Sequence, residues 1–125
     1  MYTLKYKTHY NTVETLRFQI GVYDFDKSLA IQAFSQSEDY ADYWEPYGTV
    51  TVCLAIGCAD NCAFVDTNNL PGIDTELEKE GIAKKTGRVL QSGFCVYPEM
   101  KFNTNILKQM DSEGYARYRE YRNNM

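Results

Sequence analysis

The chain has 125 residues, of which 44% are hydrophobic, 24% charged and 14% aromatic. This length fits a single domain over residues 1–125, and the aromatic content is too high for a disordered chain. No apolar run approaches the roughly 20 residues of a membrane-spanning helix, and the first residues lack the apolar core of a secretory signal. The composition therefore predicts a small globular protein of the cytoplasm, without membrane contact.

The formal net charge of −4 is unevenly distributed along the chain. Residues 38–80 carry ten acidic side chains and one lysine, whereas residues 1–37 have a net charge of +1 and residues 81–125 of +4. An acidic segment disfavours phosphate contacts and attracts a basic partner. We therefore expect no direct nucleic-acid binding. The alternative interpretation is a solvated surface whose charge keeps the protein soluble.

Alternating apolar and polar residues predict strands in the first third of the chain. Residues 2–8 fit one half-buried strand, and residues 15–24 and 29–34 fit the two arms of a hairpin. Residues 35–48 are polar and aromatic without a clear period. We expect a long connection or an irregular helix there.

The clearest predicted strand covers residues 49–56, because Val50, Val52, Leu54 and Ile56 would share one face. A short strand is expected at residues 62–66. Another is expected over residues 88–97, interrupted at Gly93.

Two helices are expected late in the chain. The first covers about residues 74–82, with Asp74 or Thr75 as its cap. The second covers about residues 103–122, with Gly114 as a break within it. Its apolar stripe consists of Leu107, Met110, Tyr118 and Tyr121. Strands followed by helices predict an α+β fold, an antiparallel β-sheet with the two helices packed on one face.

Four cysteines are the first candidate site: Cys53, Cys58, Cys62 and Cys95. Disulfides are disfavoured in a chain without an export signal. Four thiolates would suffice for a structural zinc ion, although paired Cys-x2-Cys knuckles are absent. The alternative is free thiols that pack as small hydrophobic side chains.

Support for catalysis is slight. The only histidine, His9, would have to serve any Cys–His nucleophile pair, and no phosphate-binding glycine motif is present. Carboxylate pairs such as Glu76 and Glu80 fit a solvated helix face better than acid–base chemistry. We therefore expect a protein that is not an enzyme.

An acidic, aromatic run at residues 38–47 has the best binding character, because Tyr and Trp are common interface anchors. Its predicted contact residues are Glu38, Asp39, Asp42, Tyr43, Trp44 and Glu45. The alternative is that the aromatic rings pack on the sheet while the carboxylates face water. The Arg- and Tyr-rich residues 115–122 could stack on single-stranded nucleic acid, but an exposed helix end is the simpler interpretation.

Three stretches together resemble a small domain family of unknown function. They are residues 16–23 with 29–34, residues 61–69, and residues 86–88 with 92–99. The resemblance spans roughly residues 12–110 and leaves residues 35–48 uncovered. Within it, Cys62 and Cys95 fit the family pattern, whereas Cys53 and Cys58 are less typical.

The resemblance implies a setting and no settled chemistry, because members are encoded on conjugative elements, plasmids and prophages of Firmicutes. Proteins of such mobile elements often act against host defence. By analogy with type II-A anti-CRISPR proteins, we expect a non-enzymatic inhibitor in the host bacterial cytoplasm. It would bind Cas9 through the acidic, Tyr-rich surface and block its nucleic-acid binding. The alternative is a zinc-stabilised accessory module of a conjugative element or plasmid that binds another protein.

Overall fold

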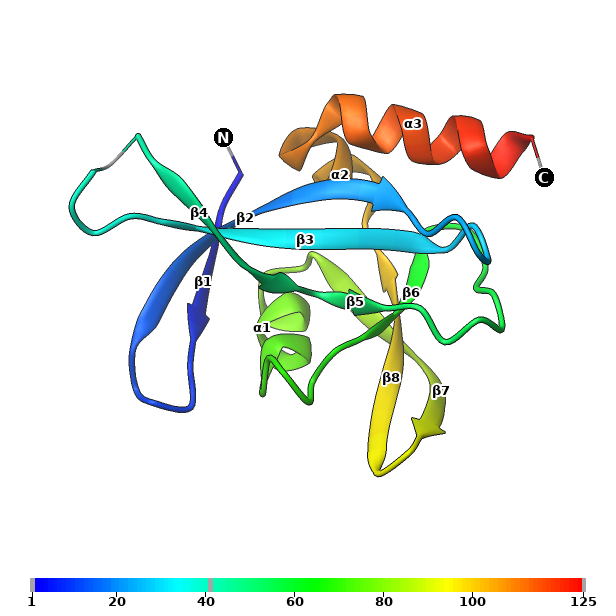
Figure 1. Ribbon diagram of the computed structural model, residues 1–125, viewed down its shortest axis with the longest axis horizontal. Coiled ribbons are helices and arrows are strands. Elements are labelled where there is room, and N and C mark those ends of the chain that lie inside the picture. Colours follow the sequence, from blue (N-terminus) through cyan, green and yellow to red (C-terminus); the bar gives the residue numbers. More distant parts are fainter. Residues whose placement is uncertain (1, 41, 125) are drawn as a thin grey trace.

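The computed structural model describes residues 2–40 and 42–124 (Figure 1). In chain order the elements are β1 (Leu4–Lys7), β2 (Val13–Val22), β3 (Leu29–Gln36), β4 (Trp44–Thr49), β5 (Thr51–Val52), β6 (Cys62–Val65), α1 (Ile73–Lys79), β7 (Ala83–Ser92), β8 (Cys95–Phe102), α2 (Thr104–Met110) and α3 (Ser112–Asn123). These elements confirm the α+β class. None of the helices within the described ranges is long and apolar enough to cross a membrane.

The strands form two antiparallel sheets instead of the one expected. The first has the order β1-β2-β3-β4 and the second β5-β6-β8-β7. The chain passes from one sheet to the other at Val50. Its N–H donates to the Ile31 carbonyl of the first sheet, and its carbonyl accepts from Asp66 beside the second, both at 2.8 Å. One backbone residue thus joins the sheets, whose long strands cross in Figure 1.

The prediction of a long connection or an irregular helix for residues 35–48 is wrong, because this segment contains most of β4. This strand pairs with β3 as an edge strand, and the pairing slips by one residue between Ala33 and Phe34. Pro46 lies opposite Phe34, and an edge strand tolerates a proline because its outer side has no ladder to complete. The bulge and the proline together interrupt the alternation of apolar and polar residues by which a strand is recognised in a sequence.

The predicted strand at residues 49–56 is shorter than its sequence pattern suggests. Extended pairing in the second sheet ends at Val52, and Ala55 adopts a left-handed backbone with φ of 63°. Ile56, expected on the same strand face as Val50, is 54% exposed, whereas Val50 is fully buried. Gly93, with φ of 63°, lies in the turn between β7 and β8, so the predicted interrupted strand is a hairpin.

All three helices lie where helical pattern was expected, with different boundaries. The residue that caps α1 is Gly72, and neither Asp74 nor Thr75 supplies a cap. The long C-terminal helix breaks at Asp111 and not at Gly114, because the Asp111 carboxylate caps α3 by accepting from the Gly114 N–H. In Figure 1, α3 runs along β2, while α1 lies on the other side of the first sheet near β1.

One hydrophobic cluster joins both sheets and all three helices. The first sheet contributes Phe18 and Ile31, the second contributes Met100, and α1 contributes Leu77. All four side chains are at most 2% exposed. Burying side chains of this size contributes about 1.5–3 kcal/mol each relative to exposure. The two sheets are therefore held by a shared core as well as by the backbone at Val50.

Candidate functional site

The acidic, aromatic residues predicted to bind a partner lie at the tip of the β3–β4 hairpin, which extends away from the body in Figure 1. We call residues 37–45 the acidic hairpin. The Ser37 N–H donates to the Tyr43 carbonyl, and the Tyr43 N–H donates to the Tyr40 carbonyl, both at 2.9 Å. The Ser37 hydroxyl accepts from the N–H groups of Asp39 and Tyr40 at 3.2 Å. Local hydrogen bonds therefore shape the tip and leave its side chains pointing outward.

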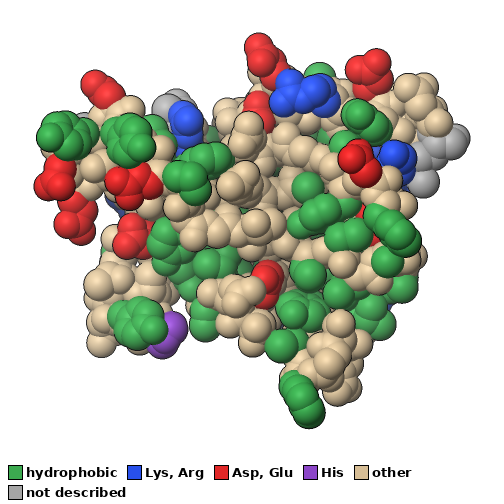
Figure 2. Space-filling view, viewed as in Figure 1, with side chains coloured by type: hydrophobic (Ala, Val, Ile, Leu, Met, Phe, Trp, Pro, Cys, Tyr) green, Lys and Arg blue, Asp and Glu red, His purple; other side chains and the backbone are tan. Residues whose placement is uncertain are grey.

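Most of the predicted contact side chains are exposed. Tyr43 is 56% exposed. The four acidic residues Glu38, Asp39, Asp42 and Glu45 are exposed as well. Figure 2 shows acidic and hydrophobic side chains gathered over this hairpin. The sequence-based prediction left out Tyr40, which is 72% exposed and lies in the same run.

Trp44 behaves differently from the other predicted contact residues. Its side chain is half-buried at the start of β4. The Arg17 guanidinium lies over its ring, 5.2 Å from the ring centre. A cation over an aromatic face is attractive by about 0.5–2 kcal/mol. The contact therefore anchors the base of the hairpin. Trp44 holds the exposed residues in place and contributes less accessible surface of its own.

Several of the other acidic side chains in residues 38–80 form ion pairs within the protein. Asp74 and Glu78 form ion pairs with Lys85, and Asp60 forms ion pairs with Arg119 and Arg122. By contrast, the part of the chain that the structure describes shows no ion pair for the acidic hairpin carboxylates.

A hollow of about 430 Å³ lies beside the acidic hairpin. Its lining includes Glu38, Asp39 and Glu45 together with Glu14 of β2, which adds a further carboxylate. Tyr47 also lines it, and burial together with the charge of Glu14 raises the pKa of this tyrosine. Uncompensated negative charge and exposed tyrosines thus meet at one end of the first sheet.

The structure places the four cysteines on separate segments. Cys62 is buried at the start of β6, and Cys95 begins β8. Cys53 and Cys58 lie in residues 53–61, which we call the cysteine loop. Within residues 2–40 and 42–124, no group of three or more potential metal-ligating side chains comes together. This arrangement favours the free-thiol alternative, and the zinc ion remains a prediction without an assembled site.

The surroundings of Cys58 and Cys62 favour the protonated thiol. Burial, and then a hydrogen bond and the charge of Glu99, raise the pKa of Cys58 to about 12. Burial and Glu99 also raise the pKa of Cys62. Metal binding and nucleophilic chemistry both require the thiolate, which these environments disfavour.

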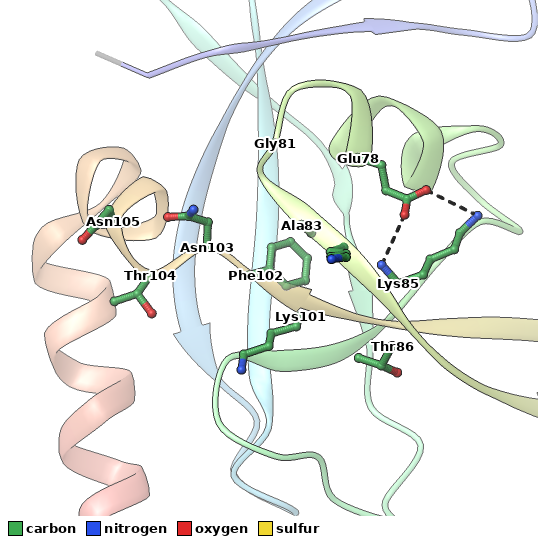
Figure 3. A pocket seen from close by; sticks show the side chains of 11 residues that line it. Glu78, Gly81, Ala83, Lys85, Thr86, Lys101, Phe102, Asn103, Thr104 and Asn105 are labelled. Atoms are coloured by element: carbon green, nitrogen blue, oxygen red, sulfur yellow. Dashed lines mark hydrogen bonds and ion pairs between the residues drawn. The ribbon is translucent and has the colours of Figure 1, made fainter.

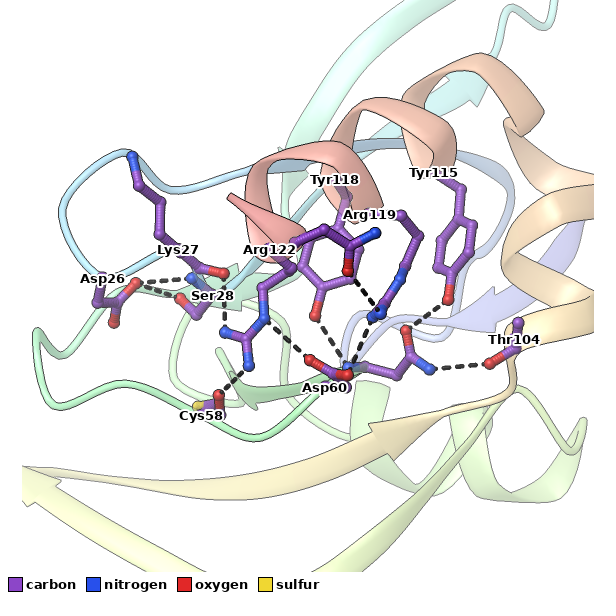
Figure 4. A network of polar contacts seen from close by, with 12 residues as sticks. Asp26, Lys27, Ser28, Cys58, Asp60, Thr104, Tyr115, Tyr118, Arg119 and Arg122 are labelled. Atoms are coloured by element: carbon purple, nitrogen blue, oxygen red, sulfur yellow. Dashed lines mark hydrogen bonds and ion pairs between the residues drawn. The ribbon is translucent and has the colours of Figure 1, made fainter. Parts of the chain in front are cut away.

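The cysteine loop is fastened to the C-terminal helix by a network that the sequence did not reveal (Figure 4). Arg122, whose side chain is 11% exposed, donates to the Asp60 carboxylate and to the carbonyls of Cys58 and Lys27, each at 3.0 Å. The Asn61 N–H donates to the Tyr118 hydroxyl at 2.9 Å. Residues 60 and 122 are far apart in sequence, and no local pattern links them.

This network bears on the two interpretations of residues 115–122, because it buries part of the segment. Tyr118 is fully buried, and Arg119 and Arg122 face Asp60. The Tyr115 hydroxyl donates to the Asn61 side-chain oxygen at 2.8 Å. The two buried tyrosines are therefore unavailable to stack on nucleic acid, whereas Arg117 and Tyr121 of α3 remain exposed.

His9 lies exposed in the turn between β1 and β2, where its ring packs against Tyr10 at a centroid distance of 4.0 Å. The cysteines lie on other elements, so the described part of the chain holds no Cys–His pair in position for nucleophilic catalysis. Among the candidate sites, the acidic hairpin is the one with an accessible set of side chains suited to a binding role.

A family model described as a domain of unknown function, DUF4313, matches residues 16–122. The chain belongs to this family. The expectation of a family without assigned function is thereby confirmed. The match begins at residue 16 and runs past residue 110 through nearly all of α3, and it also contains the acidic hairpin. No curated protein and no solved structure shows a significant match to the chain.

Proposed function

We propose that this DUF4313 protein is a non-enzymatic inhibitor whose acidic hairpin binds a basic surface of a partner protein. The observation that carries the proposal is the hairpin itself, where four exposed carboxylates without ion pairs in the described chain surround two exposed tyrosines. Such a surface matches an Arg- and Lys-rich groove in charge, and tyrosines supply the apolar contact area that anchors an interface.

The most specific form of the proposal names Cas9 as the partner. A nuclease groove that holds nucleic acid is lined by basic side chains, and a hairpin rich in carboxylates competes for the same charge. The resemblance to a family of mobile elements supports a partner in host defence. The protein then acts in the cytoplasm of the host bacterial cell, without binding nucleic acid itself.

The decisive experiment is guided DNA cleavage by type II Cas9 enzymes, with the purified protein titrated in. Dose-dependent inhibition near a one-to-one ratio is the expected result. The triple variant Asp39→Lys/Asp42→Lys/Glu45→Lys should weaken binding at least tenfold and flatten its dependence on salt. Trp44, the only tryptophan, provides a fluorescence signal for the binding itself.

A matched control separates a local effect from a change in net charge. Glu80, Glu113 and Glu120 are also exposed and lie outside the hairpin, in or beside α1 and α3. Reversing these three charges changes the net charge by the same amount and should leave inhibition close to that of the wild type. Equal inhibition by the hairpin variant and the wild type would exclude the acidic-hairpin mechanism.

Absence of inhibition across several Cas9 orthologues would overturn the Cas9 form of the proposal. Affinity purification with the wild-type protein and the hairpin variant then identifies the partner. A partner encoded by the mobile element itself would favour the alternative, an accessory module of a conjugative element or plasmid.

A further inference from the structure

A hollow of about 840 Å³ lies between α1, β7 and the start of α2 (Figure 3). Its lining combines apolar surface with three lysines and one carboxylate, Glu78, and so differs from the acidic hairpin. The side chains that matter are Lys84, Lys85, Lys101 and Thr104. Figure 3 shows Lys101 and Thr104 on the α2 side of the hollow, with Lys85 and Glu78 on the α1 side.

The register of the β7–β8 hairpin brings two lysines together. Lys84 lies directly opposite Lys101 in the antiparallel pairing, so both side chains project from the same face of the sheet. Side chains at opposite positions have Cβ atoms about 5 Å apart, and like charges placed there destabilise the pair.

An ion pair with an acidic side chain would relieve this repulsion. Lys85 on the same strand is paired with Asp74 at 3.1 Å and with Glu78 at 3.7 Å. Among the described residues, neither Lys84 nor Lys101 forms an ion pair. Glu78, the carboxylate that lines the hollow, is already paired with Lys85, so Lys84 and Lys101 have no ion-pair partner of their own among the described residues.

A hydroxyl donor lies beside the lysines. The Thr104 oxygen accepts a hydrogen bond from the Asn61 side-chain amide at 2.8 Å, so its own proton remains available to a further acceptor. The neighbouring Asn105 is exposed and also lines the hollow. Two ammonium groups and a hydroxyl around an open hollow suit an anion that accepts several hydrogen bonds.

We infer that this hollow binds a phosphate dianion, either the free ion or a monoester of a small molecule. The ammonium groups of Lys84 and Lys101 flank the anion, and the Thr104 hydroxyl donates to one of its oxygens. Lysine binds phosphate as a compact charge, and two lysines with one hydroxyl match a doubly charged group. The inference is independent of the proposed function, because the acidic hairpin contributes no residue to the hollow.

The test is a titration of the full-length protein with inorganic phosphate, followed by amide chemical shifts at constant ionic strength set with sodium chloride. We expect saturable shifts at residues 84, 101, 104 and 105. The variant Lys84→Gln/Lys101→Gln should bind at least tenfold more weakly, and Lys108→Gln, which removes an exposed lysine of α2, should bind as the wild type does. A parallel titration with glycerol 3-phosphate distinguishes the sources, because tighter binding assigns a monoester and equal or weaker binding the free ion.

Thermal unfolding gives an independent readout of the same site. Phosphate should raise the Tm of the wild type and not that of the double variant, since a ligand stabilises only the state that binds it. Without phosphate and at low salt, the double variant should be at least as stable as the wild type, because the repulsion has been removed.

Three results would overturn the inference. The shifts could rise linearly without saturation, or they could be equal in the wild type and the double variant. They could also appear without phosphate as the protein concentration rises, together with shifts at residues 38–45. That last pattern would assign the hollow to the acidic hairpin of a second copy of the chain.

Discussion

The carboxylate of Asp111 accepts a hydrogen bond from the backbone N–H of Ile20 at 2.9 Å, although the two residues are 91 positions apart. Its other oxygen accepts from the Gly114 N–H at 3.0 Å and so caps α3. β1 pairs with β2 only as far as Leu16, which leaves the edge of β2 open at Ile20. One side chain therefore begins a helix and closes the exposed edge of a strand.

This double role makes Asp111 costly to replace. The Asp111→Ala variant loses the helix cap, at about 1 kcal/mol, and leaves the Ile20 N–H unsatisfied, at a further 1–3 kcal/mol. Urea unfolding should therefore show a loss of about 2–4 kcal/mol. Asn103 caps α2, and its side chain makes no other hydrogen bond shown within the described residues, so Asn103→Ala should cost about 1 kcal/mol. Equal losses of unfolding free energy in the two variants would contradict the double role of Asp111.

Gly114 is required by the close approach of α3 to β2. A Cβ atom at this position would meet the Ile20 carbonyl oxygen and the Asp111 carboxylate well inside normal contact distance. Alanine favours a helix interior by about 1 kcal/mol over glycine, but here we expect Gly114→Ala to destabilise by at least about 2 kcal/mol. Gly48→Ala is the control, because its Cβ would lie at an ordinary 3.6 Å from Leu70. A stable Gly114→Ala protein would show that α3 can move away from the sheet.

Arg122 holds the cysteine loop through contacts that a lysine cannot reproduce. The planar guanidinium reaches a carboxylate and two carbonyls at once, whereas an ammonium is a single point donor. Arg122→Lys should lower the free energy of unfolding by about 2 kcal/mol, measured by urea denaturation. Arg117→Lys changes an exposed arginine of α3 and should stay within about 0.5 kcal/mol of the wild type.

Acid should weaken the same network. Burial alone would raise the pKa of Asp60, but hydrogen bonds and the charges of Arg119 and Arg122 outweigh it and hold the pKa below its usual value. A carboxylate with a lowered folded-state pKa contributes stability that is complete above its unfolded pKa of about 3.9 and is lost as the pH falls through the folded value.

The measurement is the free energy of unfolding between pH 6 and pH 2, for the wild type and Asp60→Asn. We expect the wild type to lose stability below about pH 4, and the variant to be less stable at pH 6 with a shallower decline. The same slope in both proteins would show that the Asp60 ion pairs contribute nothing to folding.

Removal of metal by a chelator tests whether the cysteines bind zinc. Because no metal-ligating group of three comes together in the described chain, the purified protein should contain no stoichiometric zinc, and EDTA should leave its Tm unchanged. At pH 8, Cys58 should resist alkylation, since its pKa is raised to about 12. One zinc per chain with a lower Tm after chelation would restore the metal hypothesis.

The sequence predicted the elements whose residues follow a regular period. β2 and β3 are central strands with one buried face, so their alternation was readable, and the apolar residues of α2 reach the core. β4 was missed because a bulge and Pro46 disturb its period at a sheet edge. The passage between sheets at Val50 depends on contacts with Ile31 and Asp66, which no local pattern encodes.

The candidate sites also differ in how far the sequence could predict them. Composition singled out the acidic, aromatic run at residues 38–47, because its charged and aromatic residues are adjacent in the sequence, but it did not indicate the hairpin that displays them. Lys84 and Lys101 form a pair only through the register of β7 and β8, so their relation required the structure. The distant pairing of Asp60 with Arg122 likewise has no sequence signal.

The network in Figure 4 can form only after synthesis has passed Arg122. Asp60 leaves the ribosome 62 residues before Arg122, which at 5–20 residues per second is a delay of roughly 3–12 seconds. During that interval the cysteine loop lacks Tyr118 and Arg122, and Cys58 and Cys62 are without the helix that covers the region around them. The nascent chain is therefore open to thiol oxidation and to proteases at this loop until its last helix arrives.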